Sequence, residues 1–183
     1  MWLIIGLGNP GSRYARTRHN VGFLVLEEFA GKYNLKFRDR DDYRICNGSI
    51  DGTEAVLVEP LTFMNRSGPV VKKTIRKFNI PPGKLIVIHD DLDMEPGRLR
   101  IRKSGSHGGH RGVGSVIESI GSRDFIRIKI GIGRDENMPV EDYVLSKFRR
   151  HELPLIREAV HRASEAVYSI MTDGIDYAMN SFN

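Results

Sequence analysis

The chain has 183 residues, of which 40% are hydrophobic and 28% are charged, and its formal net charge is +5. These values predict one globular domain that buries a substantial core. Cys46 is the only cysteine, which excludes an internal disulfide and favours a reducing compartment. Because the apolar start, residues 1–5, is too short for a membrane span or a signal peptide, we expect a cytoplasmic protein without a membrane partner.

The hydrophobic periodicity predicts strands and helices in alternation. In the first half we expect a buried strand at 2–5, a helix from Val21 with Asn20 as its N-cap, a hairpin of strands 43–50 and 53–59, and a helix at 67–79. In the second half we expect a central strand at 84–89, half-exposed strands at 98–103 and 125–131 around a helix at 113–121, and helices over 141–180. This order predicts a single α/β domain over 1–183, with a mixed twisted β-sheet flanked by α-helices and a helical C-terminal third.

The stretch GLGNPG, residues 6–11, matches the G-x-G-x-x-G pattern of dinucleotide-binding loops. In such loops a helix begins within the glycines, so that its N-terminus meets the pyrophosphate. Here Pro10 and a polar stretch without apolar periodicity, residues 12–20, follow the strand. We therefore interpret the glycines as turn residues that present Asn9 and His19, in preference to a nucleotide site.

Two polar residues directly follow predicted strands: Asn9 follows the first strand and Asp90 the central one. Open α/β sheets place their sites at the carboxyl ends of strands, so these residues are expected to share a crevice. A histidine beside a carboxylate is the natural general-base pair, which makes His19 the candidate base. The alternative is that His19 is an ordinary loop residue and that Asp90 lies in a solvated turn with Asp91 and Asp93.

The residues give less support to other chemistry. The chain has no G-x-S-x-G motif, and no histidine is near Cys46 in the sequence, so activated water is the favoured attacker if the protein is a hydrolase. A metal site is the main rival, with His89, Asp90, His107 and His110 as candidate ligands. Their spacing matches no metal motif that we can name.

The segment RLRIRK, residues 98–103, alternates basic and apolar residues. On a strand it would carry guanidinium groups about 6.5–7 Å apart along one face, close to the phosphate repeat of a nucleic-acid strand. We interpret this surface as a site for phosphate contacts that would be salt-sensitive. Its expected members are Arg98, Arg100, Arg102, Lys103 and Lys129, and Arg111 and Arg127 extend it. The alternative is a solvated strand face that discourages edge pairing.

Taken together, several segments resemble bacterial peptidyl-tRNA hydrolases in order and spacing, over essentially the whole chain: GLGNPG, TRHNVGF, TFMNRSG, HDDLD, GSHGGHRGVGSVI, RIKIGIGR and VLSKF. The resemblance implies a monomeric α/β enzyme without metal or organic cofactor that hydrolyses the ester between peptide and tRNA. By this resemblance His19 is the general base that activates water, Asp90 stabilises its working form, and Asn9 contacts the substrate near the scissile ester.

The resemblance also implies substrate contacts. Tyr14, Phe63 and Asn65 match family positions that contact the tRNA end or the peptide backbone, while Met64 and His110 line the cleft. From residue type alone, Phe63 and Met64 would instead be expected in the core.

One position departs from the family pattern, because Arg111 stands where family members commonly carry Asn. A guanidinium only donates hydrogen bonds, so Arg111 is expected to hold a substrate carbonyl or a phosphate. Two alternative functions remain open: a non-catalytic RNA-binding relative, and a metal-dependent esterase.

Overall fold

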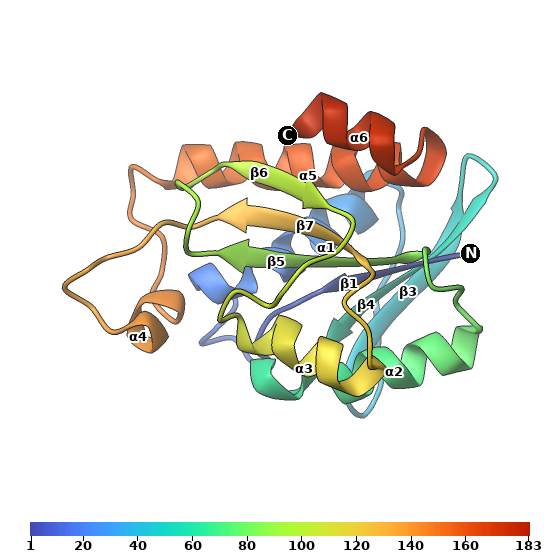
Figure 1. The fold of residues 1–183 in the computed structure, drawn as a ribbon, viewed down its shortest axis with the longest axis horizontal. Helices are drawn as coiled ribbons and strands as arrows, with labels where there is room; N and C mark the ends of the chain where they lie inside the picture. Colours follow the sequence, from blue (N-terminus) through green and yellow to red (C-terminus); the bar gives the residue numbers. More distant parts are fainter.

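The computed structural model describes residues 1–183 as a seven-stranded sheet with helices on both faces (Figure 1). The strands lie in the order β2-β3-β4-β1-β5-β7-β6. Their bounds are Trp2–Gly6 (β1), Arg38–Asp39 (β2), Tyr43–Ile50 (β3), Thr53–Pro60 (β4), Leu85–Asp91 (β5), Leu99–Arg102 (β6) and Ile126–Gly131 (β7). The α-helices are Val21–Lys32 (α1), Ser67–Phe78 (α2), Arg111–Ile120 (α3), Val140–Val144 (α4), Leu153–Thr172 (α5) and Ile175–Phe182 (α6). Two short 3₁₀ helices, Arg18–Asn20 (η1) and Met64–Arg66 (η2), precede α1 and α2.

The sheet is mixed, as the sequence predicts. Strand β1 pairs in parallel with β4 and β5, and β5 pairs in parallel with β7, whereas β2, β3 and β6 run antiparallel to their neighbours. The carboxyl ends of β1, β4, β5 and β7 therefore meet at one edge, the end near α4 toward which the β5 and β7 arrows point in Figure 1. None of the helices is both long enough and apolar enough to cross a bilayer.

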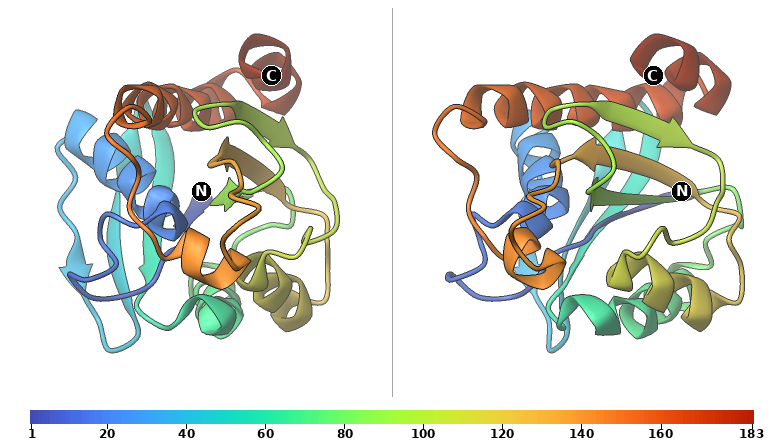
Figure 2. Two further views of the ribbon diagram at one scale, coloured as in Figure 1. Left: turned by 90° about the vertical axis from the view of Figure 1, so that its left-hand side faces the viewer. Right: turned by 60° about the vertical axis from the view of Figure 1, so that its left-hand side comes forward.

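Two apolar clusters fill the two sides of the sheet. One joins Ile4, Ile86 and Ile128 with α1 and α5, and the other joins Ile5 and Val87 with α2 and α3. The side views in Figure 2 show α5 and α6 on one side of the sheet and α2 and α3 on the other. Strands β1 and β5 are buried on both faces, which explains their nearly continuous apolar sequence.

Close packing of α1 on the strand ends depends on glycine. A Cβ atom on Gly6 would lie 2.4 Å from the carbonyl oxygen of Gly22, and one on Gly22 would lie 2.6 Å from the carbonyl oxygen of Ile88. Of the three loop glycines interpreted as turn residues, only Gly11 has a positive φ, 101°. That interpretation is therefore wrong for Gly6, where the missing side chain instead lets α1 approach the sheet.

Most expected elements are confirmed, including the hairpin, whose turn residues Asp51 and Gly52 have positive φ. The strand expected at 125–131 forms as β7, but the expectation that it is half-exposed is wrong, because β7 lies between β5 and β6 and Arg127 is 2% exposed. Asn20 immediately precedes α1, but its side chain makes no capping hydrogen bond and instead bonds the backbone of Asn9. Helix α3 begins two residues earlier than expected, so Arg111 is its first residue.

Candidate active site

A cavity of about 440 Å³ opens at the carboxyl edge of the sheet. Its walls come from the loop after β1, the loop after β4, the end of β5, the glycine-rich segment 106–110 and helix α4. The sequence-predicted residues that line it are Asn9, Tyr14, His19, Phe63, Met64, Asn65, Asp90, His110, Arg111 and Lys129. Asn9 and Asp90 therefore share one crevice, as predicted, although Asp90 lies within β5 and does not follow it.

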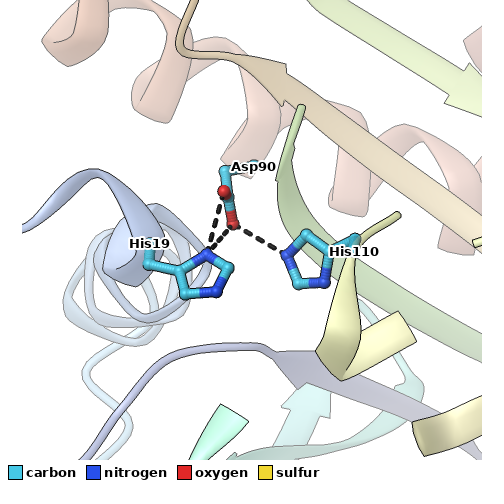
Figure 3. A group of neighbouring side chains, drawn as sticks. All are labelled: His19, Asp90 and His110. Carbon is cyan, nitrogen blue, oxygen red and sulfur yellow. Dashed lines mark hydrogen bonds and ion pairs between the residues drawn. The ribbon is translucent and has the colours of Figure 1, made fainter. Parts of the chain in front are cut away.

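Two histidines share the carboxylate of Asp90 (Figure 3). His19 Nδ1 lies 2.9 Å from both oxygens of Asp90, and His110 Nε2 lies 2.9 Å from its Oδ1. The Asp90 side chain is 2% exposed and that of His19 is 11% exposed. The expectation that Asp90 lies in a solvated turn is therefore wrong.

Hydrogen bonding fixes which nitrogen of each ring carries a proton. The Val113 N–H donates to His110 Nδ1, so His110 Nε2 carries the proton that is donated to Asp90. His110 thus caps α3 with one ring nitrogen and holds Asp90 with the other. On His19, Nδ1 donates to Asp90, which leaves Nε2 as the unprotonated nitrogen without a partner in the protein. An acceptor nitrogen of this kind is what a general base requires.

The carboxyl group of Asp90 is held ionised. Its burial alone would raise the pKa, but the electrostatic attraction of the His19 and His110 rings and the hydrogen bonds that both donate outweigh burial and hold the pKa of Asp90 well below its ordinary value. A permanent negative charge beside His19 favours the imidazolium that forms when His19 takes a proton.

His89 lies beside this pair and stays neutral. Burial lowers its pKa to about 3. Its Nδ1 donates to the backbone oxygen of Asp90 at 2.7 Å, and its ring packs edge-on against His110, with 4.8 Å between centroids. His89 Nε2 is buried without a hydrogen-bond partner.

Asn9 is held by two neighbours. Its backbone N–H donates to Asn20 Oδ1 at 2.9 Å, and Asn20 Nδ2 donates to its backbone oxygen at 2.9 Å. The Met64 N–H donates to Asn9 Oδ1 at 2.7 Å, so this oxygen is occupied. The Asn9 Nδ2 group makes no hydrogen bond within the protein and is left as a donor at the cavity wall.

The segment after β4 supplies a second wall. Met64 is buried, as expected for a core residue, and it also lines the cavity. Phe63 is 58% exposed, so the expectation of a core position is wrong for it. Asn65 is exposed at the cavity, and Tyr14 faces it from the loop after β1.

Arg111 and Glu141 face each other across the cavity. Arg111 starts α3, Glu141 lies in α4, both are exposed, and their side chains form an ion pair. Helix α4 also contributes Val140 and Val144 to the lining. The sequence predicts no site residue in α4, a helix of only five residues whose Val144 begins the segment VLSKF.

The basic residues in and beside β6 and β7 differ in their burial and in their ion-pair partners. Arg100 is paired in register with Lys129, and Arg102 with Arg127, so these four share one face of the sheet. Lys129 forms an ion pair with Asp91 at the cavity, and Lys103 forms one with Asp176 at 2.5 Å. Arg98 and Lys103 flank β6, so only two of the expected guanidinium groups lie on the strand itself.

The sequence pattern predicts that Arg127 extends the exposed basic surface, but its side chain is buried. It donates to the backbone oxygens of Gly105 and Ser106, at 2.5 Å for Ser106. It therefore anchors the segment that leads to His110.

The possible metal ligands that the structure brings together are His19, Asp90 and His110, whose ligand atoms lie within 4.8 Å of one another. The set of four expected from the sequence is not the one that forms, because His107 is absent from this cluster and His89 Nδ1 is bonded to a backbone oxygen. Within this cluster, His19 Nδ1 and His110 Nε2 are hydrogen-bonded to Asp90.

Comparisons with known proteins match a single family over nearly the whole chain. Residues 3–183 match the family model described as peptidyl-tRNA hydrolase. The peptidyl-tRNA hydrolase of Thermodesulfovibrio yellowstonii is 46% identical over 185 residues, covering 100% of this chain and 99% of the relative. That of Syntrophomonas wolfei is 45% identical over 184 residues, covering both proteins completely.

Solved structures agree with these sequence matches. The crystal structure of peptidyl-tRNA hydrolase from Acinetobacter baumannii superposes with a TM-score of 0.95 at 37% identity, covering 100% of this chain and 94% of the other. The α/β fold and the cavity with its histidine–aspartate pair thus fit a hydrolytic enzyme. The chain belongs to the peptidyl-tRNA hydrolase family.

Proposed function

We propose that this protein hydrolyses the ester bond that joins a peptide to the terminal ribose of tRNA, and so recycles tRNA from stalled or dropped-off translation. The observation that carries the proposal is the His19–Asp90 pair, which leaves His19 Nε2 as a free base in a cavity lined by family-matching residues. The pair is already assembled in this structure, with His19 Nδ1 in hydrogen-bond contact with Asp90.

The geometry supports attack by water. His19 Nε2 takes a proton from a water molecule, whose oxygen attacks the ester carbonyl carbon and forms a tetrahedral oxyanion. Asn9 Nδ2, the free donor at the cavity wall, stabilises the negative charge that develops on the former carbonyl oxygen. The intermediate collapses with cleavage of the bond to the ribose oxygen, which takes the proton from His19. The products are the free peptide acid and tRNA with its terminal hydroxyl restored.

Asp90 and His110 support His19 through separate contacts. Ionised Asp90 holds the His19 Nδ1–H and stabilises the transient imidazolium. His110 fixes the second side of Asp90 and is itself fixed by α3. Tyr14, Phe63 and Asn65 are assigned to the tRNA end and the peptide backbone, with Met64 and His110 in the lining; the presence of all five at the cavity supports this assignment.

The tRNA phosphates are assigned to the basic residues near β6: Arg98, Arg100, Arg102, Lys103 and Lys129. Arg100 lies beside Lys129, which itself lines the cavity, so a basic strip leads from the sheet edge to the ester site. Such contacts position the substrate by charge and shape. We further propose a cytoplasmic monomer that works without a metal or an organic cofactor.

The experiment is peptide release from a short N-blocked aminoacyl-tRNA, with and without EDTA. We expect release that is unchanged by the chelator. Binding of tRNA without release would contradict the enzyme and favour an RNA-binding relative. Release abolished by EDTA and restored by a divalent metal would contradict the metal-free mechanism and point to an ion at His19, Asp90 and His110.

A further inference from the structure

Arg18 is the largest fully buried polar side chain, and it precedes the candidate base His19 in the chain. It is 1% exposed and is not part of the cavity lining. The general-base mechanism gives it no role, although it lies in the short 3₁₀ helix that carries His19.

The guanidinium group of Arg18 gathers contacts from a distant part of the chain. It forms a two-pronged ion pair with Glu152, with nitrogen–oxygen distances of 2.9 and 2.8 Å, and its Nε donates to Ser146 Oγ at 3.1 Å. The rings of Tyr143 and Phe148 lie against it, with centroids 4.3 and 5.0 Å from Cζ. These four residues lie between the last part of α4 and the start of α5, and one further contact, at 3.5 Å, joins Arg18 to the backbone oxygen of Ile132 after β7.

The backbone repeats the same connection. The Arg18 N–H donates to the backbone oxygen of Ser146 at 3.0 Å, and Thr17 forms an isolated antiparallel bridge with Lys147. The loop that carries His19 is therefore tied to the segment that immediately follows α4. Helix α4 is itself a wall of the cavity, through Val140, Glu141 and Val144.

A buried ion pair is weak support for stability as such, because desolvation of both charges offsets their attraction. What the Arg18–Glu152 pair supplies here is fixed geometry: planar, two-pronged hydrogen bonds allow little rotation of either partner. Near-attack geometry is sensitive to small displacements of a base relative to the bound substrate.

We infer that Arg18 is a positioning residue, which sets the α4 wall of the cavity relative to His19 through its contacts with Glu152 and Ser146. This inference rests on the proposed hydrolysis. Arg18 touches no substrate; it fixes the distance between the group that activates water and the surface that holds the ester.

The test compares two ion pairs: the buried Arg18–Glu152 pair, and the Arg44–Glu59 pair, in which Glu59 is buried and Arg44 is 33% exposed. Arg18→Lys and Glu152→Gln alter the pair that joins His19 to the α4 segment. Arg44→Lys and Glu59→Gln make the same changes in the pair between β3 and β4, which does not line the cavity. For each variant, kcat and KM for an N-blocked aminoacyl-tRNA are measured at a temperature where circular dichroism shows a folded protein, and Tm is recorded.

We expect Arg18→Lys and Glu152→Gln each to lower kcat by at least about tenfold, with KM within about twofold of wild type. A displaced base impairs turnover more than tRNA binding. The control variants are expected to change Tm while leaving kcat within about twofold. The carbon chemical shift of the His19 imidazole should move in Arg18→Lys and stay fixed in Arg44→Lys, a readout that needs no turnover.

Folded Arg18→Lys and Glu152→Gln proteins with wild-type kcat and an unmoved His19 signal would overturn the inference. Should Arg18→Lys not fold, Ser146→Ala leaves the Arg18–Glu152 pair in place and removes the contact to Nε together with the hydrogen bond that Ser146 Oγ donates to the backbone oxygen of Tyr143. An unchanged kcat for Ser146→Ala and for Glu152→Gln would overturn the inference equally. Failure of the proposed function is distinct, because the wild-type protein would then release no peptide.

Discussion

His19 Nδ1 lies 2.9 Å from each carboxylate oxygen of Asp90, so a single N–H is held between two acceptors. This arrangement orients the ring about the carboxylate and directs the opposite nitrogen, Nε2, away from it. The orientation of the base is thus fixed by Asp90 of β5, a strand that is buried along most of its length.

Removal of the base tests this relationship. We expect His19→Ala to lower kcat by at least the roughly 10²-fold that is typical of general-base loss, with tRNA affinity nearly unchanged. Asp90→Asn should also lower kcat strongly, because an uncharged amide does not stabilise the imidazolium. Steady-state kinetics and tRNA binding by filter retention provide the measurements. A near-normal kcat for His19→Ala would remove His19 from the base role.

Asn9 and Asn65 line the same cavity but differ in how firmly they are held, which separates their expected roles. Asn9 is buried and its Oδ1 is occupied by the Met64 N–H, so its Nδ2 is a preorganised donor. We expect Asn9→Ala to lower kcat by about 10²–10³-fold, the usual cost of losing an oxyanion donor. Asn65→Ala, at the exposed position, serves as the matched variant and should act mainly on KM. The reverse pattern would assign the oxyanion to Asn65.

The sequence predicts the strands well where burial on both faces gives a continuous apolar run, or where the turn residues are typical of a hairpin. The apolar runs of β1 and β5 are such cases, and they place Asn9 and Asp90 in one crevice. The turn at Asp51 and Gly52 is another case. The resemblance adds the remaining cavity residues, which the residue types by themselves did not assign. Phe63 illustrates the limit, since residue type favours the core and the structure exposes it.

What the sequence does not predict depends on contacts between distant segments. Alternation made Arg127 look exposed, but its cation is buried and bonds two backbone oxygens of a loop about 20 residues earlier. Asn20 has the residue type of an N-cap, yet its side chain bonds Asn9. The partner of Arg18, Glu152, lies 134 positions away, and no local pattern marks such a pair.

Arg111 allows a test of the substrate contact that departs from the family pattern. In the structure it pairs with Glu141 at the cavity, and both side chains are well exposed, so solvent screens the pair and leaves it easily exchanged for a substrate group. If that group is a phosphate, Arg111→Asn should raise KM at low salt and reduce the slope of log KM against log salt concentration by about 1. Arg134→Asn, which alters an exposed pair with Asp93 outside the basic strip, is the control. An unchanged slope would leave only the carbonyl contact.

Glu59 gives the protein a stability that decreases as pH rises. Its side chain is fully buried, and one carboxylate oxygen has no hydrogen-bond partner. Burial outweighs the neighbouring Arg44 guanidinium and raises the pKa of Glu59 to about 7, from an ordinary value of 4.5. Below pH 4.5 the carboxyl is protonated in both the folded and the unfolded chain, so it has no effect on stability there.

Between pH 4.5 and about 7 the unfolded chain loses this proton first, so stability falls as pH rises, by about 3 kcal/mol in total for a shift of this size. Glu59→Gln removes the titration, and its free energy of unfolding relative to wild type should therefore increase from pH 4.5 to pH 8. Urea unfolding at both pH values measures this difference, with Glu54→Gln, at an exposed position of the same strand, as control. A difference between Glu59→Gln and wild type that is the same at both pH values would show that Glu59 ionises normally in the folded protein.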